Sequence, residues 1–178
     1  MATSHQAEGR PFQPVCIAVL TVSDTRTPAS DKSGDTLAAL IGEAGHTLAA
    51  RALVKDEVPS IVRPLKAWID DPGIDCIIST GGTGLTGRDV TIEAMRPLFE
   101  KEIDGFSALF HAVSYKSVGT STMQSRACAG LARGTFLFAL PGSPGACRDA
   151  WEHILRFQLD SRHMPCNLVA LMPRLTER

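Results

Sequence analysis

The sequence predicts an α/β fold, a three-layer αβα sandwich built around a mostly parallel sheet. Short apolar runs recur along the chain, and segments with helical spacing of apolar residues separate them. Strands that alternate with helices in this way favour parallel pairing, because each helical crossover returns the chain to the same edge of the sheet.

The expected strands are four short apolar runs. They span residues 15–22, 47–54, 76–80 and 135–140. The first run, VCIAVLTV, is apolar on both faces, which a central parallel strand requires because helices cover it on both sides. We therefore expect residues 15–22 in the middle of the sheet.

The expected helices carry apolar residues three and four positions apart. Two clear helical faces are Leu37, Leu40, Ile41 and Ala44 before Gly45, and Ile61, Leu65, Trp68 and Ile69 after Pro59. Further helical stretches are expected at about 91–100, over 104–133 and around 150–159.

The composition indicates one compact domain. The chain has 178 residues, of which 44% are hydrophobic and 21% are charged, values typical of a globular protein with a substantial core. No repeat or linker divides it. We expect a flexible polar arm over 1–14, a single domain over 15–170 and a short tail over 171–178.

Charge and hydropathy argue against several classes of protein. The formal net charge is −1, so no overall field attracts nucleic acid or an anionic membrane. The apolar runs are too short to span a membrane, and residues 1–14 lack the apolar core of an export signal. The five cysteines are scattered, which favours free thiols over disulfides or a zinc site. These features predict a cytoplasmic protein.

Polar and small residues follow each predicted strand. They are Ser23-Asp24, Lys55-Asp56-Glu57, and the segments 81–84 (GGTG) and 141–144 (PGSP). Open α/β sheets bind ligands beyond the carboxyl ends of their strands. We therefore expect a ligand site at this edge of the sheet.

The loop after the third strand, STGGTGLTGRDVT (79–91), has two interpretations that spacing alone leaves equal. Glycine amides can approach an anion closely, Thr83 and Thr86 can add hydroxyl donors, and a helix starting near Thr91 would offer its positive end. The loop would then bind phosphate. The alternative is a tight turn that merely requires glycine.

The same loop matches a dinucleotide pattern literally, through Gly82, Gly84 and Gly87. That pattern should be followed by an acidic residue at the end of the next strand, about twenty residues on. The region 100–104 instead indicates polar helix or loop. NAD binding is therefore the weaker alternative. A Walker-type GxxxxGK[ST] motif is also absent from the sequence, which argues against a P-loop NTPase.

Asp56 and Asp89 belong to different loops of the predicted edge. Two carboxylates beside a phosphate site repel the substrate unless a cation lies between them, and Mg²⁺ binds carboxylate and phosphate oxygens together. For Asp24, Asp31 and Glu57 the sequence favours helix caps or solvated turns. The hydroxyl-rich run 120–126 also favours helix capping over a ligand contact.

Taken together, these segments resemble the MoaB/MogA family, which includes the molybdopterin-binding domains of gephyrin-type proteins. The signature is TGGTG at 80–84 followed by RDVT at 88–91, and the likeness runs from about 15 to 167. Several further segments resemble MoaB rather than MogA: 119–122, 124–127, 141–143, 146–148 and 165–167.

The resemblance implies the MogA-like molybdopterin-binding fold, a homotrimer or homohexamer, and transfer of AMP from Mg-ATP to molybdopterin. Other enzymes of the molybdenum-cofactor pathway are further candidate partners. Carried over by motif, Asp56 and Asp89 are the catalytic carboxylates and hold Mg²⁺ through the substrate phosphates. The implied substrate-binding residues are Ser23, Asp24, Thr80, Gly81, Gly82, Thr83, Gly84, Arg88, Ser125, Arg126, Pro141, Gly142, Ser143 and Pro144.

An alternative within the family is a paralogue that binds molybdopterin or a precursor without chemistry. Some MoaB paralogues depart from RDVT and lack adenylylation, whereas Arg88, Asp89, Val90 and Thr91 are all present in this chain. The intact motif favours catalysis.

Overall fold

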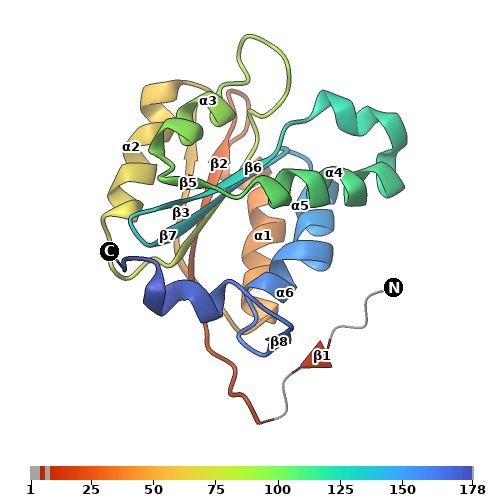
Figure 1. The fold of residues 1–178 in the computed structure, drawn as a ribbon. Helices are drawn as coiled ribbons and strands as arrows, with labels where there is room; N and C mark the ends of the chain where they lie inside the picture. The colour runs from red at the N-terminus through yellow and green to blue at the C-terminus, as the bar shows by residue number, and fades with distance from the viewer. Residues whose placement is uncertain (1–4, 7–8, 178) are drawn as a thin grey trace.

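The structure is a computed structural model that describes residues 5–6 and 9–177 (Figure 1). Its centre is a six-stranded sheet in the spatial order β3-β2-β4-β7-β6-β5. The strands are β3 (Thr47–Val54), β2 (Cys16–Val22), β4 (Cys76–Thr80), β7 (Thr135–Leu140), β6 (Cys128–Ala132) and β5 (Lys101–Glu102).

The sheet is mostly parallel, as the sequence predicts. β2 pairs in parallel with β3 and β4, and β4 pairs in parallel with β7. β6 runs antiparallel to β7, and β5 runs antiparallel to β6. The apolar run that starts the domain therefore lies inside the sheet, with six of the seven β2 residues buried.

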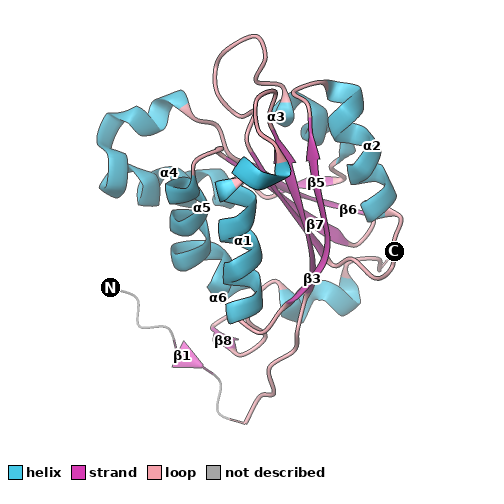
Figure 2. Cartoon of the chain, turned by 180° about the vertical axis from the view of Figure 1, so that it is seen from behind, coloured by secondary structure: helices cyan, strands magenta, loops and turns pink. Residues whose placement is uncertain are grey.

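Helices cover both faces and complete the three layers (Figure 2). One group packs on one face, and α2 and α3 pack on the other, so that two apolar clusters flank the sheet. The first group consists of α1 (Lys32–Glu43), α4 (Asp104–Val118), α5 (Pro144–Ala150), the π-helical turn η4 (Trp151–Leu155) and α6 (Arg156–Gln158). The second consists of α2 (Val58–Ile69) and α3 (Thr91–Met95).

The prediction of helix over 104–133 is wrong in its second half. α4 ends at Val118, because Gly119 takes φ +61°, and a 3₁₀ segment η3 (Gly119–Gln124) follows. The next residues, CAGLA, form β6, which is buried throughout. A short, fully buried strand of small residues has no alternating pattern, so its sequence cannot distinguish it from buried helix.

Two neighbouring segments also differ from expectation. The region 100–104, expected as polar helix or loop, contains the two-residue strand β5. The helix expected over 91–100 stops at Met95 and continues as the 3₁₀ turn η2 (Arg96–Leu98), because Pro97 cannot donate the next helical hydrogen bond.

Parts of the arm expected over 1–14 contact the domain where the structure describes them. β1 (His5–Gln6) pairs with β8 (His163–Met164), and the Gln13 amide donates to Ser161 Oγ at 2.9 Å. The Phe12 ring lies against His46, with the ring centroids 5.2 Å apart. Residues 1–4 and 7–8 lie outside the described chain.

The chain end is likewise joined to the domain, since the 3₁₀ segment η5 (Val169–Arg174) crosses the expected boundary at 170 and Val169 is buried. The cysteines are free, and Cys76, Cys128 and Cys147 are buried. Across the residues described, no helix has both the length and the apolar character needed to cross a membrane.

Candidate active site at the carboxyl edge of the sheet

A cleft of about 280 Å³ opens at the carboxyl edge of the parallel strands. The loops that follow β2, β3, β4 and β7 all contribute to it, and Ser125 adds one residue from the segment after η3. The lining residues are Val22, Ser23, Arg26, Asp56, Gly81, Gly82, Thr83, Gly84, Arg88, Asp89, Ser125, Pro141 and Gly142. The four strand ends named by the sequence thus form one site.

The glycines of the β4 loop are required by close backbone approaches. Gly81 takes φ +101°, and a Cβ built there would lie 2.1 Å from the Val22 carbonyl oxygen. Gly82 takes φ +61°, and a Cβ there would lie 2.4 Å from Asp56 Oδ1. Any side chain at either position would collide with a neighbouring strand end or with the carboxylate.

Thr91 ties the end of this loop back to its beginning. Its hydroxyl donates to the Gly81 carbonyl at 2.8 Å, and its amide donates to the Gly82 carbonyl at 2.9 Å. α3 spans only Thr91–Met95, so the expected contribution of a long helix terminus to anion binding is small. The loop, rather than the helix terminus, therefore provides the backbone groups that face the cleft.

Asp56 and Asp89 face the same cleft from different loops. Their carboxylates lie beside Gly82 and Gly84 respectively, since a Cβ on Gly84 would approach Asp89 Oδ2 to 2.8 Å. The two acids are close enough that the charge of Asp89 acts on Asp56. Both side chains can therefore reach one bound ligand.

The environments of these two carboxyls differ. Burial raises the pKa of Asp56, and the negative charges of Asp24 and Asp89 add to that effect. Burial also acts against ionisation of Asp89, but hydrogen bonds from the Thr86 hydroxyl and amide lower its pKa overall. Thr86 donates to Asp89 Oδ2 at 2.6 Å from Oγ1 and 2.9 Å from N.

Arg88 forms a bidentate ion pair with Asp24 beside the cleft. Nε and Nη2 donate to the Asp24 carboxylate at 2.9 and 3.0 Å, and the side chains of Arg88 and Asp24 are 61% and 34% exposed. Asp24 Oδ1 also accepts the Asp56 amide at 3.2 Å. An exposed pair of this kind is weak, so an incoming phosphate can compete with Asp24 for Arg88.

Arg26 is a site residue that the sequence reasoning missed. It lies in the loop after β2 and donates to the Gly142 carbonyl and to Ser33 Oγ. Asp31, 3.8 Å from Arg26, is 1% exposed and accepts from Thr21 Oγ1 at 2.7 Å and from the Gly34 amide at 3.0 Å. The helix-cap interpretation of Asp31 is confirmed, but only the fold reveals that the same carboxylate also supports Arg26.

Several residues implied by the family motifs lie behind the cleft wall. Thr80 is fully buried and donates to the Pro141 carbonyl at 2.9 Å. Ser143 caps α5 by accepting the Ala146 amide, and Pro144 is the first residue of that helix. Neither these three residues nor Asp24 and Arg126 are among the residues that line the cleft.

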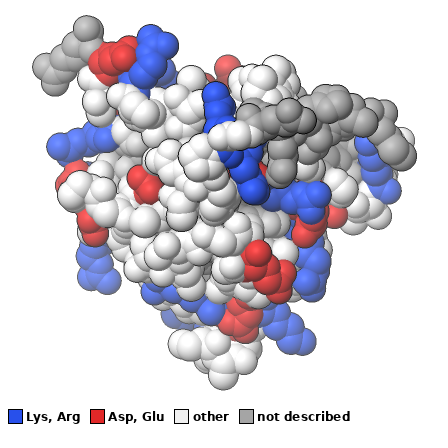
Figure 3. Space-filling view, turned by 90° about the horizontal axis from the view of Figure 1, so that it is seen from below, with Lys and Arg blue, Asp and Glu red and all other residues white. Residues whose placement is uncertain are grey.

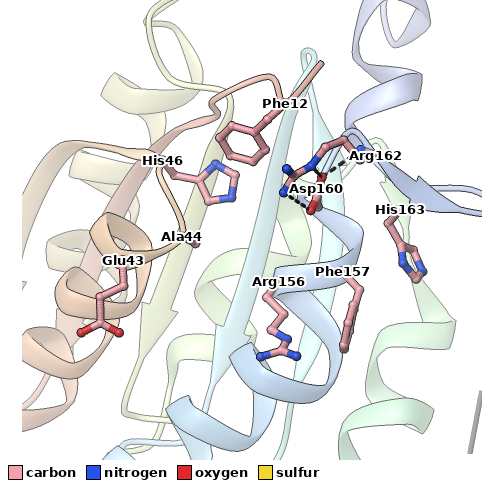
Figure 4. A pocket seen from close by; sticks show the side chains of 9 residues that line it. All are labelled: Phe12, Glu43, Ala44, His46, Arg156, Phe157, Asp160, Arg162 and His163. Carbon is pink, nitrogen blue, oxygen red and sulfur yellow. Dashed lines mark hydrogen bonds and ion pairs between the residues drawn. The ribbon is translucent and has the colours of Figure 1, made fainter. Parts of the chain in front are cut away.

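A larger cavity, of about 360 Å³, lies at the opposite end of the sheet (Figure 4). Two of its charged side chains are paired within the chain, Arg162 with Asp160 and Arg156 with Glu152. Glu43 points away from the other side chains in this view. On the face seen from below, basic and acidic residues are interspersed (Figure 3). The cavity contains none of the site residues expected from the sequence, and its size alone does not make it the active site.

A metal bound by protein side chains alone is not indicated. Within the described part of the chain, no group of three His, Cys, Asp or Glu residues is arranged to hold an ion. Two carboxylates beside a glycine loop that an anion could approach fit Mg²⁺ well, because that ion is usually held by one or two carboxylates together with substrate phosphates and water.

The sequence matches the family model described as "Probable molybdopterin binding domain" over residues 18–161. The chain belongs to the MoaB/MogA family. Molybdenum cofactor biosynthesis protein B of Escherichia coli is 47% identical over 156 residues, which cover 88% of this chain and 92% of the relative.

Solved structures agree with this MoaB/MogA assignment. A crystal structure of molybdenum cofactor biosynthesis protein B superposes with a TM-score of 0.85 at 37% identity, covering 95% of this chain and all of that one. The tungsten cofactor synthesizing protein MoaB from Pyrococcus furiosus gives a TM-score of 0.72 at 35% identity, over 80% of this chain and 91% of that one.

Membership makes this a MoaB-family protein of molybdenum cofactor biosynthesis, and both halves of its family signature lie at the cleft. Gly81 to Gly84 form its glycine wall, and Arg88 and Asp89 line it directly.

Proposed function

We propose that the chain is a molybdopterin adenylyltransferase that moves AMP from Mg-ATP onto the terminal phosphate of molybdopterin. One observation carries the proposal: two carboxylates from separate strand ends, Asp56 and Asp89, share a cleft with a glycine loop whose backbone can approach an anion. A site for a reacting phosphate needs both a loop that contacts the phosphate oxygens and carboxylates that can hold a cation.

The proposed step is a displacement at phosphorus. An oxygen of the molybdopterin phosphate forms a bond to the α-phosphorus of ATP, the bond from that phosphorus to the bridging oxygen breaks, and pyrophosphate leaves with the electron pair. The protein would promote this step by placing the molybdopterin phosphate in line with the α-phosphate of ATP and by lowering the repulsion between these two anions.

Different residues around the cleft would bind the phosphates, position the substrates and hold the cation. Backbone groups of the segment 81–84 would hold phosphate oxygens, and Arg88 would exchange Asp24 for a phosphate. Ser23 and Ser125, which both line the cleft, would position the substrates through their hydroxyls. Asp56 and Asp89 would hold Mg²⁺, which when bound neutralises phosphate charge.

The decisive experiment compares wild-type protein with Asp89→Asn in the presence of molybdopterin and Mg-ATP. We expect the variant to lose AMP transfer by about a hundredfold or more while retaining most pterin binding, because a neutral amide binds Mg²⁺ poorly. Equal pyrophosphate release by both proteins would remove Asp89 from the mechanism.

The same assay separates the alternatives. Tight pterin binding by wild-type protein without pyrophosphate release would identify a molybdopterin-binding paralogue that performs no chemistry. Saturable binding of NAD(H) in a calorimetric titration would instead favour the dinucleotide interpretation of the Gly82, Gly84 and Gly87 pattern.

The proposal also includes assembly and location. We expect a homotrimer or homohexamer, as the resemblance to the family implies. Apolar residues that α4 exposes away from its buried face, among them Leu109, Tyr115 and Val118, support self-association. Contacts with other enzymes of the pathway would hand the product on. A cytoplasmic location follows from the use of ATP as substrate.

A further inference from the structure

The guanidinium of Arg126 donates hydrogen bonds to the backbone of the glycine loop and does not line the cleft. Nε donates to the Thr83 carbonyl at 3.1 Å and to the Gly84 carbonyl at 3.0 Å, and Nη2 donates to the Asp89 carbonyl at 3.0 Å. Nη1 and Nη2 also pair with the Glu93 carboxylate on α3. Every nitrogen of the group therefore has a partner within the chain.

The backbone of Arg126 reinforces the same contact. Its amide donates to the Thr83 carbonyl at 3.0 Å, so one residue holds that carbonyl through both main chain and side chain. Arg126 follows Ser125, which lines the cleft, but is not itself a lining residue. It lies behind the wall that the substrate would contact.

The direction of these carbonyls matters for anion binding. In a trans peptide the C=O and the following N–H point in opposite directions. When Arg126 draws the carbonyls of Thr83 and Gly84 to its side, the amides of Gly84 and Leu85 must point the other way. A loop that binds phosphate through its amides needs its carbonyls turned from the anion in this manner.

The same guanidinium also fixes one of the two carboxylates. The Asp89 peptide is held through its carbonyl, while the Asp89 side chain accepts hydrogen bonds from Thr86. Arg126 thus links both ends of the segment 83–89 to α3.

We propose that Arg126 is a positioning residue that orients the 83–89 loop for phosphate and places Asp89, with Glu93 holding the guanidinium in place. This role deepens the proposed adenylyl transfer and rests on it for its catalytic consequence. The structural part, which concerns the loop alone, does not depend on any reaction.

The structural part is tested by amide hydrogen exchange in the ligand-free protein. We expect Arg126→Lys and Arg126→Ala to exchange roughly tenfold to a hundredfold faster over residues 83–90, because several charge-assisted hydrogen bonds are lost, while β4 and α1 keep wild-type protection. Lysine cannot reproduce the planar fork that meets two carbonyls and a carboxylate together. Glu93→Gln should show a smaller effect in the same segment.

Arg133→Ala is the matched control. Arg133 pairs with Asp70 at another part of the surface, so its removal should leave exchange over 83–90 unchanged. Wild-type exchange in this loop for Arg126→Lys and Arg126→Ala would overturn the proposal, as would equal acceleration throughout the protein.

The catalytic part is tested by AMP transfer. We expect Arg126→Lys to lower kcat about tenfold to a hundredfold and to raise the Mg²⁺ concentration for half-maximal rate, with little change in KM for ATP. A merely structural loss would reduce active protein without moving the Mg²⁺ requirement. A raised KM with unchanged kcat would overturn the positioning role and indicate direct substrate contact.

Failure of the proposed function is distinguishable from failure of this inference. Wild-type protein that transfers no AMP would remove the adenylyltransferase, whereas the exchange comparison would still decide whether Arg126 orders the loop. Added guanidinium ion provides a last check, since it should slow exchange over 83–90 in Arg126→Ala and have no such effect in wild-type protein.

Discussion

At the scale of single residues, the informative pair is Asp56 and Asp89, whose environments shift their pKa values in opposite directions. Burial, aided by Asp24 and Asp89, raises the pKa of Asp56, whereas hydrogen bonds from Thr86 outweigh burial at Asp89 and lower its pKa. The surroundings stabilise the charged form of Asp89 and disfavour the charged form of Asp56, and a cation held between the two acids would offset the unfavourable effect at Asp56.

This difference predicts opposite effects on stability. A carboxyl whose folded pKa is raised stabilises the fold while it is protonated, and that contribution is lost as the pH rises through the folded pKa. Asp56→Asn should therefore raise the melting temperature at neutral pH. The gain in the free energy of unfolding should be about 1 kcal/mol or less, because Asp56 is only partly buried and solvent screens its charge.

Asp89→Asn should change the stability at neutral pH in the opposite direction. The lowered pKa of Asp89 contributes stability above the unfolded value of about 3.9, and that stability is lost as the pH falls through the folded pKa. The variant should melt below wild type at neutral pH, with the difference vanishing in acid. Thermal melts across pH check both substitutions, and a neutral-pH loss of stability for Asp56→Asn would contradict the argument.

At the scale of elements, the loop after β4 shows why its glycines are not equivalent. Gly81 has positive φ and no room for a Cβ beside Val22 O, whereas a Cβ on Gly87 would meet nothing within 4 Å. Both belong to the same glycine-rich sequence. Only the packing of β2 against β4 distinguishes them.

We therefore expect Gly81→Ala to destabilise the protein by about 2 kcal/mol or more, because the new methyl group collides with backbone and the residue is strained at φ +101°. Gly87→Ala should change the free energy of unfolding by less than about 0.5 kcal/mol. Urea denaturation of both variants measures the difference. Equal losses would mean that the loop relaxes around either side chain.

The same scale explains what the sequence could predict. The four parallel strands were predictable because each apolar run ends in Gly, Pro or polar residues, and their shared carboxyl edge then indicated where the candidate site would lie. β6 was not predictable, because CAGLA lacks any strand pattern. Its Gly130 packs closely against Phe99, whose ring would lie 2.2 Å from a Cβ on Gly130, and this contact is visible only in the fold. Arg26 was missed for a similar reason: its place beside Gly142 depends on contacts 116 residues apart.

At the scale of the whole molecule, α4 is the element least explained by a single chain. Phe106, Phe110 and Ser114 form its buried face, spaced four residues apart. Tyr115 and Val118, near its outer end, are 61% and 53% exposed, and Met123 in η3 is 76% exposed. Figure 1 shows this segment projecting from the body of the fold. A helix that is apolar beyond its buried face indicates a covering partner.

A second copy of the chain is the partner that the proposed homo-oligomer requires. We expect the double variant Tyr115→Glu, Val118→Glu to reduce the molar mass in light scattering toward that of one 19.0 kDa chain, because two carboxylates would be desolvated at the contact. Leu171→Glu is the matched control, since Leu171 is 47% exposed on η5, away from α4. A double variant that keeps the wild-type mass would place the interface elsewhere.

Loss of the oligomer should also weaken substrate binding, because Ser125 follows η3 directly and lines the cleft. Wild-type affinity in a monomeric variant would show that the cleft is complete within one chain.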